Sequence, residues 1–334
     1  MTGKDMRELI YTVPESCEGT TVQTFLRRTC GVSARLLARL KRVEQGITAD
    51  GVHIRSVDRL RAGQTVRLRL PADAVRVEGA DMPLAVVYED ESVLAVDKPP
   101  YLAVHPSAGH TEPTLAAAVI AHFEREGNAF AFRPINRLDR NTSGLLLAAK
   151  NPHAAHLLGG SGKGGRVEKE YRALVLGRLE GEGVIEQPIR VKKGFGITRE
   201  VGAGEGSKYC LTRWESLAAA DDLSLLRVRI ETGRTHQIRV HMAWLGHPLA
   251  GDTMYGTDGG TLPRHALHCG AMRFRHPVSG REVALTAPLP EDMASLLRER
   301  GWDDRPDRWG GWENGAAEPV RLEEKSCGFY ADGI

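Results

Sequence analysis

The sequence has few cysteines and no long apolar run, and these shortages exclude several classes of protein. Its five cysteines are scattered over 334 residues and form no C-x-x-C pair, whereas a disulfide framework or a zinc site needs clustered thiols. We expect ordinary thiols in a reducing compartment. The segment Met1–Glu15 lacks the apolar core of a secretory signal, and no apolar run approaches a membrane span. The expectation is a cytoplasmic protein that does not enter a membrane.

Charge is distributed unevenly along the chain, although its net value is only +2. Between Glu18 and Leu70 there are eleven Lys and Arg residues against four Asp and Glu residues, while the segment Asp303–Ile334 is acidic. A basic region of this kind predicts contact with a polyanion, and a solvated charged surface is the alternative. The chain is long enough for a sizeable core and two domains.

Residues 15–73 are predicted to form a small domain with two helices followed by short strands. The first helix covers Val22–Thr29 and the second Ala34–Gln45, because apolar side chains recur there at helical spacing. Three arginines of the second helix recur at i, i+4 and i+7 and are expected to share one stripe, from which they could neutralise RNA phosphates: Arg35, Arg39 and Arg42. A solvated helix face is the alternative.

A linker is predicted at residues 74–82 and a larger domain at residues 83–300. Strands and helices do not alternate regularly in the larger domain, which favours an α+β fold. We expect a mixed, mainly antiparallel sheet with flanking helices, beside the small N-terminal α+β domain. Residues 301–334 are rich in glycine, proline and charge, which predicts a poorly ordered tail.

The most informative segment is Asn136–Gly144, in which Asp139 stands between two arginines in a polar turn. The apolar strand Leu145–Ala149 follows directly. A carboxylate at such a place either braces the loop through local hydrogen bonds or performs chemistry at the edge of a sheet. Local chemistry by itself leaves both interpretations open.

A second segment, Thr232–His241, decides in favour of chemistry, because together the two segments resemble the signature motifs of RluA-type pseudouridine synthases. Further motifs of that family follow in order within residues 84–290: Asp97–Pro106, Lys169–Val175, Gly246–Asp252, Phe274–Gly280 and Ala287–Pro290. The small N-terminal domain likewise resembles the RNA-binding domain first known from ribosomal protein S-four.

The resemblance implies that the protein isomerises uridine within folded RNA and that Asp139 is the catalytic aspartate. The base leaves its ribose, turns and rejoins through carbon 5, so no cofactor is expected. Asp139 would act as a nucleophile or as a base. Arg239 matches the family's arginine that pairs with this aspartate, and Tyr171 matches its active-site tyrosine, whose ring can stack on uracil.

Other residues of the two segments are predicted to bind the substrate. Arg137 is expected to fill the stack after the uridine has been flipped out, and Arg234 and His236 are expected to contact RNA. Asn136 is also predicted to contact the substrate. It departs from the family pattern, because the family commonly has histidine at this position. The histidines lack metal-ligand spacing, and no metal site is expected.

Two functions from different classes remain open. The favoured function is a pseudouridine synthase acting on ribosomal RNA, with transfer RNA as the other substrate class. The alternative is a catalytically silent RNA-binding or ribosome-assembly protein, which has little use for Asp139, Tyr171 and Arg239 together. A monomer is the expected oligomeric state.

Overall fold

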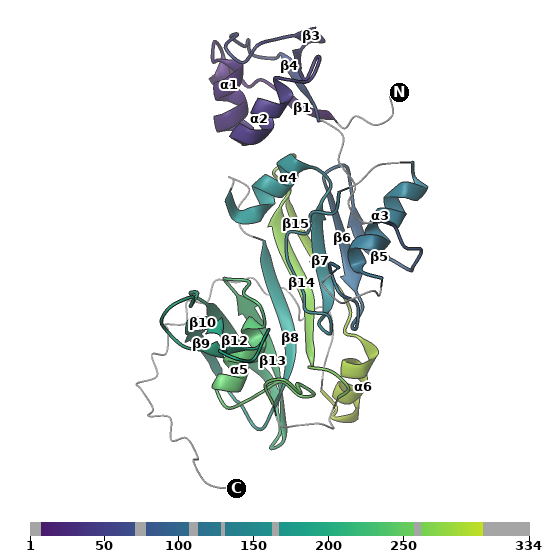
Figure 1. Ribbon diagram of the computed structural model, residues 1–334, viewed down its shortest axis with the longest axis vertical. Helices are drawn as coiled ribbons and strands as arrows, with labels where there is room; N and C mark the ends of the chain where they lie inside the picture. Colours follow the sequence, from purple (N-terminus) through teal and green to yellow (C-terminus); the bar gives the residue numbers. More distant parts are fainter. Residues whose placement is uncertain are drawn as a thin grey trace. The chain divides into compact units, whose positions relative to one another are not determined.

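The computed structural model describes residues 8–70, 78–106, 113–127, 131–161, 167–256 and 262–302. In these ranges it contains a four-stranded, a two-stranded and a nine-stranded sheet, most of whose pairs are antiparallel (Figure 1). This confirms the predicted α+β fold class. None of the described helices is long and apolar enough to cross a membrane. Residues 74–77 of the predicted linker and nearly all of the predicted tail lie outside the described residues.

The N-terminal region builds a four-stranded antiparallel sheet with short helices. Its strand order is β1 (Glu8–Thr12), β4 (Thr65–Arg69), β2 (Ile47–Ala49) and β3 (Val52–His53). The helical elements are η1 (Glu15–Cys17), α1 (Val22–Thr24), η2 (Phe25–Thr29) and α2 (Ala34–Leu40). The sheet therefore includes a strand that precedes the predicted start of this domain.

Helix α2 ends earlier than the predicted Gln45, and this corrects the helical stripe of arginines. Its start is as expected, since Ser33 Oγ accepts a hydrogen bond from Leu36 N at 3.1 Å. After Leu40 the backbone forms turns. Gln45 has a left-handed φ of 52°, which is incompatible with a right-handed helix. Arg35 and Arg39 remain on exposed positions of α2, but Arg42 lies beyond the helix.

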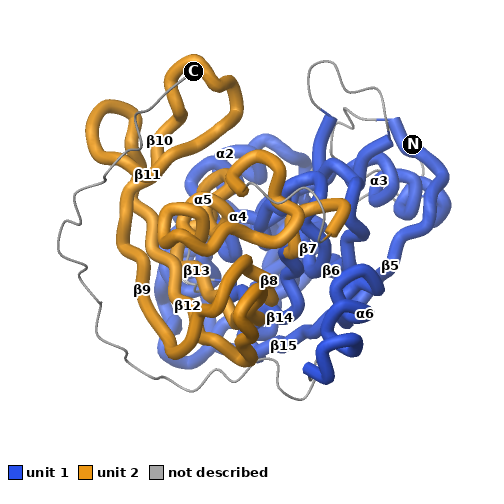
Figure 2. The backbone as a smooth tube through the Cα atoms, turned by 90° about the horizontal axis from the view of Figure 1, so that it is seen from below, with its two compact units in different colours: residues 1–170, 267–310 blue, residues 171–266, 311–334 orange. Residues whose placement is uncertain are grey.

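The nine-stranded sheet has the order β5-β6-β7-β14-β8-β13-β12-β9, with β15 paired to β14. Its strands are β5 (Ala85–Glu89), β6 (Val93–Lys98), β7 (Ser143–Ala149), β8 (Glu168–Leu176), β9 (Glu182–Glu186), β12 (Leu211–Ala219), β13 (Leu223–Ile230), β14 (Leu267–Arg275) and β15 (Glu282–Thr286). The chain divides into two compact units, residues 1–170 and 267–310 and residues 171–266 and 311–334 (Figure 2). The division falls inside β8.

In the first unit, β6 and β7 are apolar strands whose side chains are almost all buried, as expected for the centre of a sheet. The helical elements of this unit, besides those of the N-terminal region, are α3 (Leu115–Arg125), α4 (Pro152–His156), η3 (Leu157–Ser161) and α6 (Glu291–Glu299). Helices α3 and α4 begin at the caps Thr114 and Asn151, whose side chains accept backbone N–H groups.

In the second unit, β12 pairs with β13 on one side and β9 on the other. A separate ribbon is formed by β10 (Ile189–Val191) and β11 (Arg199–Val201). Helix α5 (Gln237–Trp244) carries the second half of the second signature segment, and all its residues from Gln237 to Met242 are buried. Arg239 is therefore held by a packed helix.

Candidate active site

Asp139 lies in the loop that leads into β7. The preceding Leu138 is buried, while the flanking Arg137 and Arg140 are exposed and Asp139 itself is partly buried. The Asp139 carbonyl oxygen accepts a hydrogen bond from Thr142 N at 3.1 Å, which closes a turn directly before the strand. The buried Leu138 side chain anchors the loop, while the polar side chains of Arg137 and Arg140 on either side stay exposed to solvent.

A buried lysine ties this loop to the preceding motif. Lys98, at the end of β6, is 0% exposed and donates to three carbonyl oxygens: Pro99 O at 2.7 Å, Leu102 O at 3.0 Å and Arg140 O at 3.1 Å. A buried ammonium is tolerated when such acceptors surround it. Sequence reasoning assigned Lys98 no role, although its place between an apolar strand and two prolines was a usable signal.

Asn136 braces the same loop through its amide. The side chain is buried, its Nδ2 donates to Leu145 O at 3.1 Å, and its Oδ1 accepts from Leu147 N at 2.8 Å. Both ends of the amide thus replace backbone hydrogen bonds beside β7. This is a structural role that the sequence did not reveal, and the substrate contact predicted for Asn136 stays a prediction.

Gly144 allows β7 to run close to β14, its parallel neighbour. Its φ is +106°, and a Cβ atom there would lie 2.2 Å from Cys269 O. Beside it, Ser143 Oγ and His268 Nδ1 are 3.0 Å apart. The strand that follows Asp139 is therefore fixed by backbone proximity and by a buried side-chain contact.

Two titratable residues of the motif Asp97–Pro106 have shifted pKa values. Burial raises the pKa of Asp97 to about 6, and the adjacent Lys98 only partly opposes this. Desolvation, and secondarily the charge of Arg137, lower the pKa of His105. His105 also stacks at a tilt on Phe132, with ring centroids 5.2 Å apart.

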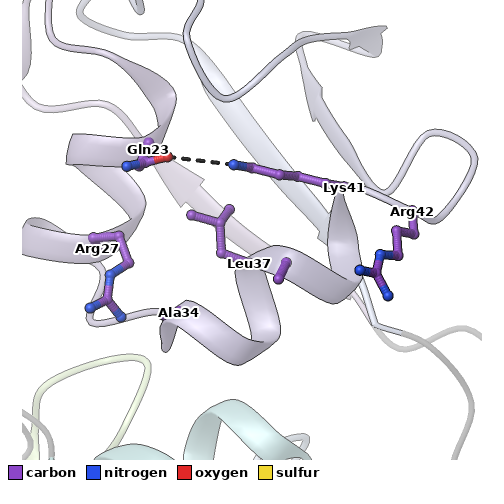
Figure 3. A pocket seen from close by; sticks show the side chains of 7 residues that line it. Gln23, Arg27, Ala34, Leu37, Lys41 and Arg42 are labelled. Atoms are coloured by element: carbon purple, nitrogen blue, oxygen red, sulfur yellow. Dashed lines mark hydrogen bonds between the residues drawn. The ribbon is translucent and has the colours of Figure 1, made fainter.

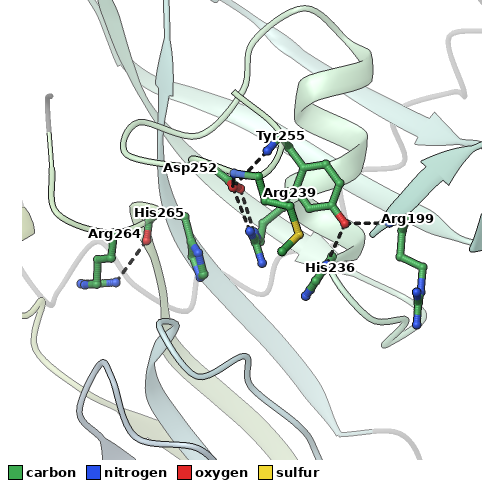
Figure 4. A network of polar contacts seen from close by, with 8 residues as sticks. Arg199, His236, Arg239, Asp252, Tyr255, Arg264 and His265 are labelled. Carbon is green, nitrogen blue, oxygen red and sulfur yellow. Dashed lines mark hydrogen bonds and ion pairs between the residues drawn. The ribbon is translucent and has the colours of Figure 1, made fainter. Parts of the chain in front are cut away.

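In the second unit, Arg239 of α5 forms a bidentate ion pair with Asp252 (Figure 4). Arg239 Nε donates to Asp252 Oδ2 at 2.7 Å and Nη2 donates to Oδ1 at 2.8 Å. The two side chains are 7% and 0% exposed. Burial by itself would raise the pKa of Asp252, but the Arg239 guanidinium outweighs it and holds that pKa below its usual value.

Tyr255 completes the network around Arg239. The Arg239 Cζ atom lies 5.0 Å from the centroid of the Tyr255 ring, within cation–π range. The Tyr255 hydroxyl accepts a hydrogen bond from Arg199 N at 2.9 Å and lies 2.7 Å from His236 Nδ1. His236, the residue before α5, has a left-handed φ of 59°. Asp252 belonged to a recognised motif without an assigned role, and Tyr255 was missed.

The other predicted residues of this unit lie on β8 and at the start of α5. Tyr171 is 4% exposed and lies on β8. Arg234 is exposed, and its Nε donates to Tyr209 O at 3.4 Å. Asp139 belongs to the first unit and Arg239 to the second, so their predicted pairing stays a prediction.

Among the described residues, one group could approach a metal ion. Ligand atoms of Glu89, His122 and Glu126 lie within 4.8 Å of one another. However, Glu89 already accepts a hydrogen bond from Lys150 Nζ at 2.8 Å and lies 2.9 Å from His122 Nε2. An ion-pair cluster on α3 and β5 accounts for this arrangement.

Known proteins identify the family to which these motifs belong. The family model described as RNA pseudouridylate synthase matches residues 92–244. The uncharacterised RNA pseudouridine synthase YjbO of Bacillus subtilis is 36% identical over 271 residues, which is 80% of this chain and 95% of that protein. Ribosomal large subunit pseudouridine synthase D of Vibrio cholerae is 36% identical over 246 residues, or 68% and 75% of the two chains.

The structure of human RNA pseudouridylate synthase domain containing 4 has the same fold, with a TM-score of 0.51 and 19% identity. That match covers 64% of this chain and 92% of the human one. On the sequence matches, the chain belongs to the RluA-type RNA pseudouridine synthase family. It is an RNA pseudouridine synthase, as the motifs predicted.

Proposed function

We propose that the enzyme isomerises specific uridines in structured RNA, with ribosomal RNA as the favoured substrate and Asp139 as the catalytic carboxylate. Ribosomal RNA is favoured because one relative covering two thirds of the chain is named for the large ribosomal subunit. The observation that carries the assignment of Asp139 is the fixed loop around it. Lys98, Asn136 and Gly144 anchor both sides of that loop through buried contacts.

The reaction redistributes atoms within one nucleotide. The bond between uracil N1 and ribose C1′ breaks, a bond between uracil C5 and C1′ forms, C5 loses its proton and N1 gains one. Asp139 as nucleophile would attack the sugar or the ring, and as base it would take a proton from the neighbouring ribose carbon. Both routes need an ionised carboxylate and a uridine flipped out of its stack.

The remaining predicted residues receive roles in the same reaction. Arg239, which is always charged and is held in place by Asp252, would stabilise the ionised form of Asp139. Tyr171 would stack on the turning uracil, and Arg137, exposed beside Asp139, would fill the vacated stack. Arg234 and His236, at the start of α5, would contact RNA.

The test is release of tritium from RNA labelled at uracil carbon 5, because joining the base through that carbon expels its hydrogen. Ribosomal and transfer RNA from cells that lack the enzyme are assayed separately. Wild-type enzyme should release tritium from ribosomal RNA, and Asp139→Asn should release none while still binding it. Turnover by Asp139→Asn would disprove the assignment of the carboxylate. Binding without release by the wild type would favour the silent RNA-binding protein.

We also propose that the N-terminal region binds the RNA backbone, in line with its resemblance to the S-four RNA-binding domain. A cavity of about 340 Å³ opens beside α2 (Figure 3). It is lined by Gln23, Arg27, Ala34, Leu37, Ala38, Lys41 and Arg42. Of the three predicted arginines only Arg42 lines it, while Arg35 and Arg39 lie on exposed positions of α2.

Charge reversal tests this binding. The combined change Arg27→Glu, Lys41→Glu and Arg42→Glu should weaken RNA binding. It should also reduce the slope of the logarithm of the binding constant against the logarithm of the salt concentration by about three, since each phosphate contact contributes about one. Arg61→Glu, an exposed change on the turn before β4, is the matched control. An unchanged salt slope in the triple variant would contradict a phosphate-binding role for this cavity.

A further inference from the structure

The ribbon of β10 and β11 ends in an exposed apolar tip that the reaction does not explain. Val191 is 52% exposed, Phe195 60% and Ile197 65%. Exposed apolar clusters of this kind mark binding surfaces more often than exposed single residues do. The tip is therefore a candidate contact surface in the second unit.

Hydrogen bonds give the tip a defined shape. Lys192 N donates to Thr198 O at 3.0 Å, Phe195 N donates to Lys192 O at 3.2 Å, and Thr198 N donates to Phe195 O at 3.0 Å. Gly194 and Gly196 have positive φ angles of 81° and 56°, which lets the chain turn sharply on either side of Phe195. A preformed tip loses little conformational freedom on binding.

Charge around the tip indicates the kind of ligand. The segment 189–208 contains five cationic residues, Arg190, Lys192, Lys193, Arg199 and Lys208, against the two acidic residues Glu200 and Glu205. Lys192 Nζ lies 4.5 Å from the centroid of the Phe195 ring, yet Phe195 stays 60% exposed. An aromatic ring among cations suits an unpaired nucleotide, whose base can stack and whose phosphate is anionic.

The ribbon is joined directly to the network around Arg239. Arg199, the first residue of β11, donates its backbone N–H to the Tyr255 hydroxyl, which also contacts His236 (Figure 4). The Arg199 side chain reaches back to the tip, where Nη1 donates to Ile197 O at 2.7 Å. One residue thus connects the apolar tip to the start of α5.

We infer that the tip at residues 192–198 binds an unpaired nucleotide of the substrate RNA, with the base stacked on Phe195 and the phosphates near Lys192 and Lys193. The inference rests on the proposed function and extends it by one substrate contact. Because the ribbon is tied to Tyr255, this contact would help to hold the RNA in register with the residues at the start of α5.

The test compares Phe195→Leu, which keeps an apolar side chain but removes the ring, with Phe195→Tyr, which keeps the ring. The probe is a fluorescein-labelled single-stranded oligouridylate, and its dissociation constant is measured by fluorescence anisotropy with the full-length protein. Loss of one base–aromatic stack corresponds to a weakening of about tenfold. Phe195→Leu should show this loss, and Phe195→Tyr should bind within about twofold of the wild type.

The matched control is Val278→Ala, which trims another exposed apolar side chain, 40% exposed, in the first unit and should not change binding. If Phe195→Leu binds the probe as tightly as the wild type, or Phe195→Tyr is as weak as Phe195→Leu, the stacking role is wrong. In the first of these cases the Phe195 ring does not contribute to binding of single-stranded RNA. Tritium release by Asp139→Asn is measured separately, so failure of the catalytic assignment is distinguished from failure of this contact.

Discussion

The ion pair of Arg239 with Asp252 provides the sharpest test of how the second unit holds its motif. Asp252→Ala removes the carboxylate that accepts two hydrogen bonds from the buried guanidinium of Arg239. Asp252 Oδ1 also accepts from Met254 N at 3.1 Å and Tyr255 N at 3.3 Å, and these bonds are lost as well. We therefore expect a large loss of stability, not only a loss of activity.

The size of the loss follows from burial. Both side chains are nearly inaccessible, at 7% and 0% exposed, so solvent does not replace the missing partner. Breaking a buried pair by removing one partner costs about 3–5 kcal/mol. The change is measured as the shift in the urea midpoint of the cooperative transition, followed by circular dichroism and converted with the denaturant slope.

Two comparisons make this prediction refutable. Glu180→Ala removes one of the two acidic partners of Arg178, in a pair that is 54% and 62% exposed, and should leave the midpoint almost unchanged because solvent screens the pair. The double variant Asp252→Ala with Arg239→Met should recover part of the loss, since the buried guanidinium has then been removed together with the carboxylate. A shift for Asp252→Ala no larger than that of Glu180→Ala would refute the buried-pair argument.

The same pair also predicts how stability depends on acid. Asp252 has a pKa lowered below its usual value of about 4, so its contribution to stability is present above that value. The contribution is lost as the pH falls through the lowered pKa, because the protonated carboxyl no longer balances the guanidinium. Asp252→Asn should remove this acid-dependent part of the unfolding profile.

Two further predictions concern residues that position the motifs. Gly144→Ala should destabilise the first unit and abolish tritium release, because its Cβ atom would lie 2.2 Å from Cys269 O at a φ of +106°; a soluble, fully active variant would contradict this. Burial lowers the pKa of His241 to about 4, so between about pH 6.5 and 4 the unfolded chain takes up a proton that the folded chain does not. Stability should fall over that window, and His241→Gln should flatten the fall in urea midpoints measured at several pH values.

Local patterns were sufficient to predict the class of fold and much of its element structure. Thr114 is a local cap for α3, and the proline pair after Lys98 ends β6, and both signals stand in the sequence itself. The chain turns between β2 and β3 at Asp50 and Gly51, which both adopt a positive φ that these residue types favour. Each of these features depends on neighbouring residues, which is why sequence reasoning could find them.

The helix that ends at Leu40 shows where this reasoning stops. Apolar periodicity continues to Val43, but the chain turns into β2 and Gln45 adopts a left-handed conformation. A Cβ atom at Gly46 would lie 2.2 Å from Leu40 O, so the turn relies on close backbone contact. Packing against the sheet decides this end, and periodicity contains no information about it.

The sequence by itself determined the family, the fold class and the segments that carry the motifs, because these follow from residue order and local chemistry. Only the tertiary structure decided that Arg239 pairs with Asp252, that Lys98 donates hydrogen bonds to three carbonyl oxygens, and that Asn136 forms hydrogen bonds with the backbone of β7. These contacts join residues that only folding brings together. A buried charged or polar group must find partners wherever the packed backbone offers them, and that choice is made in three dimensions.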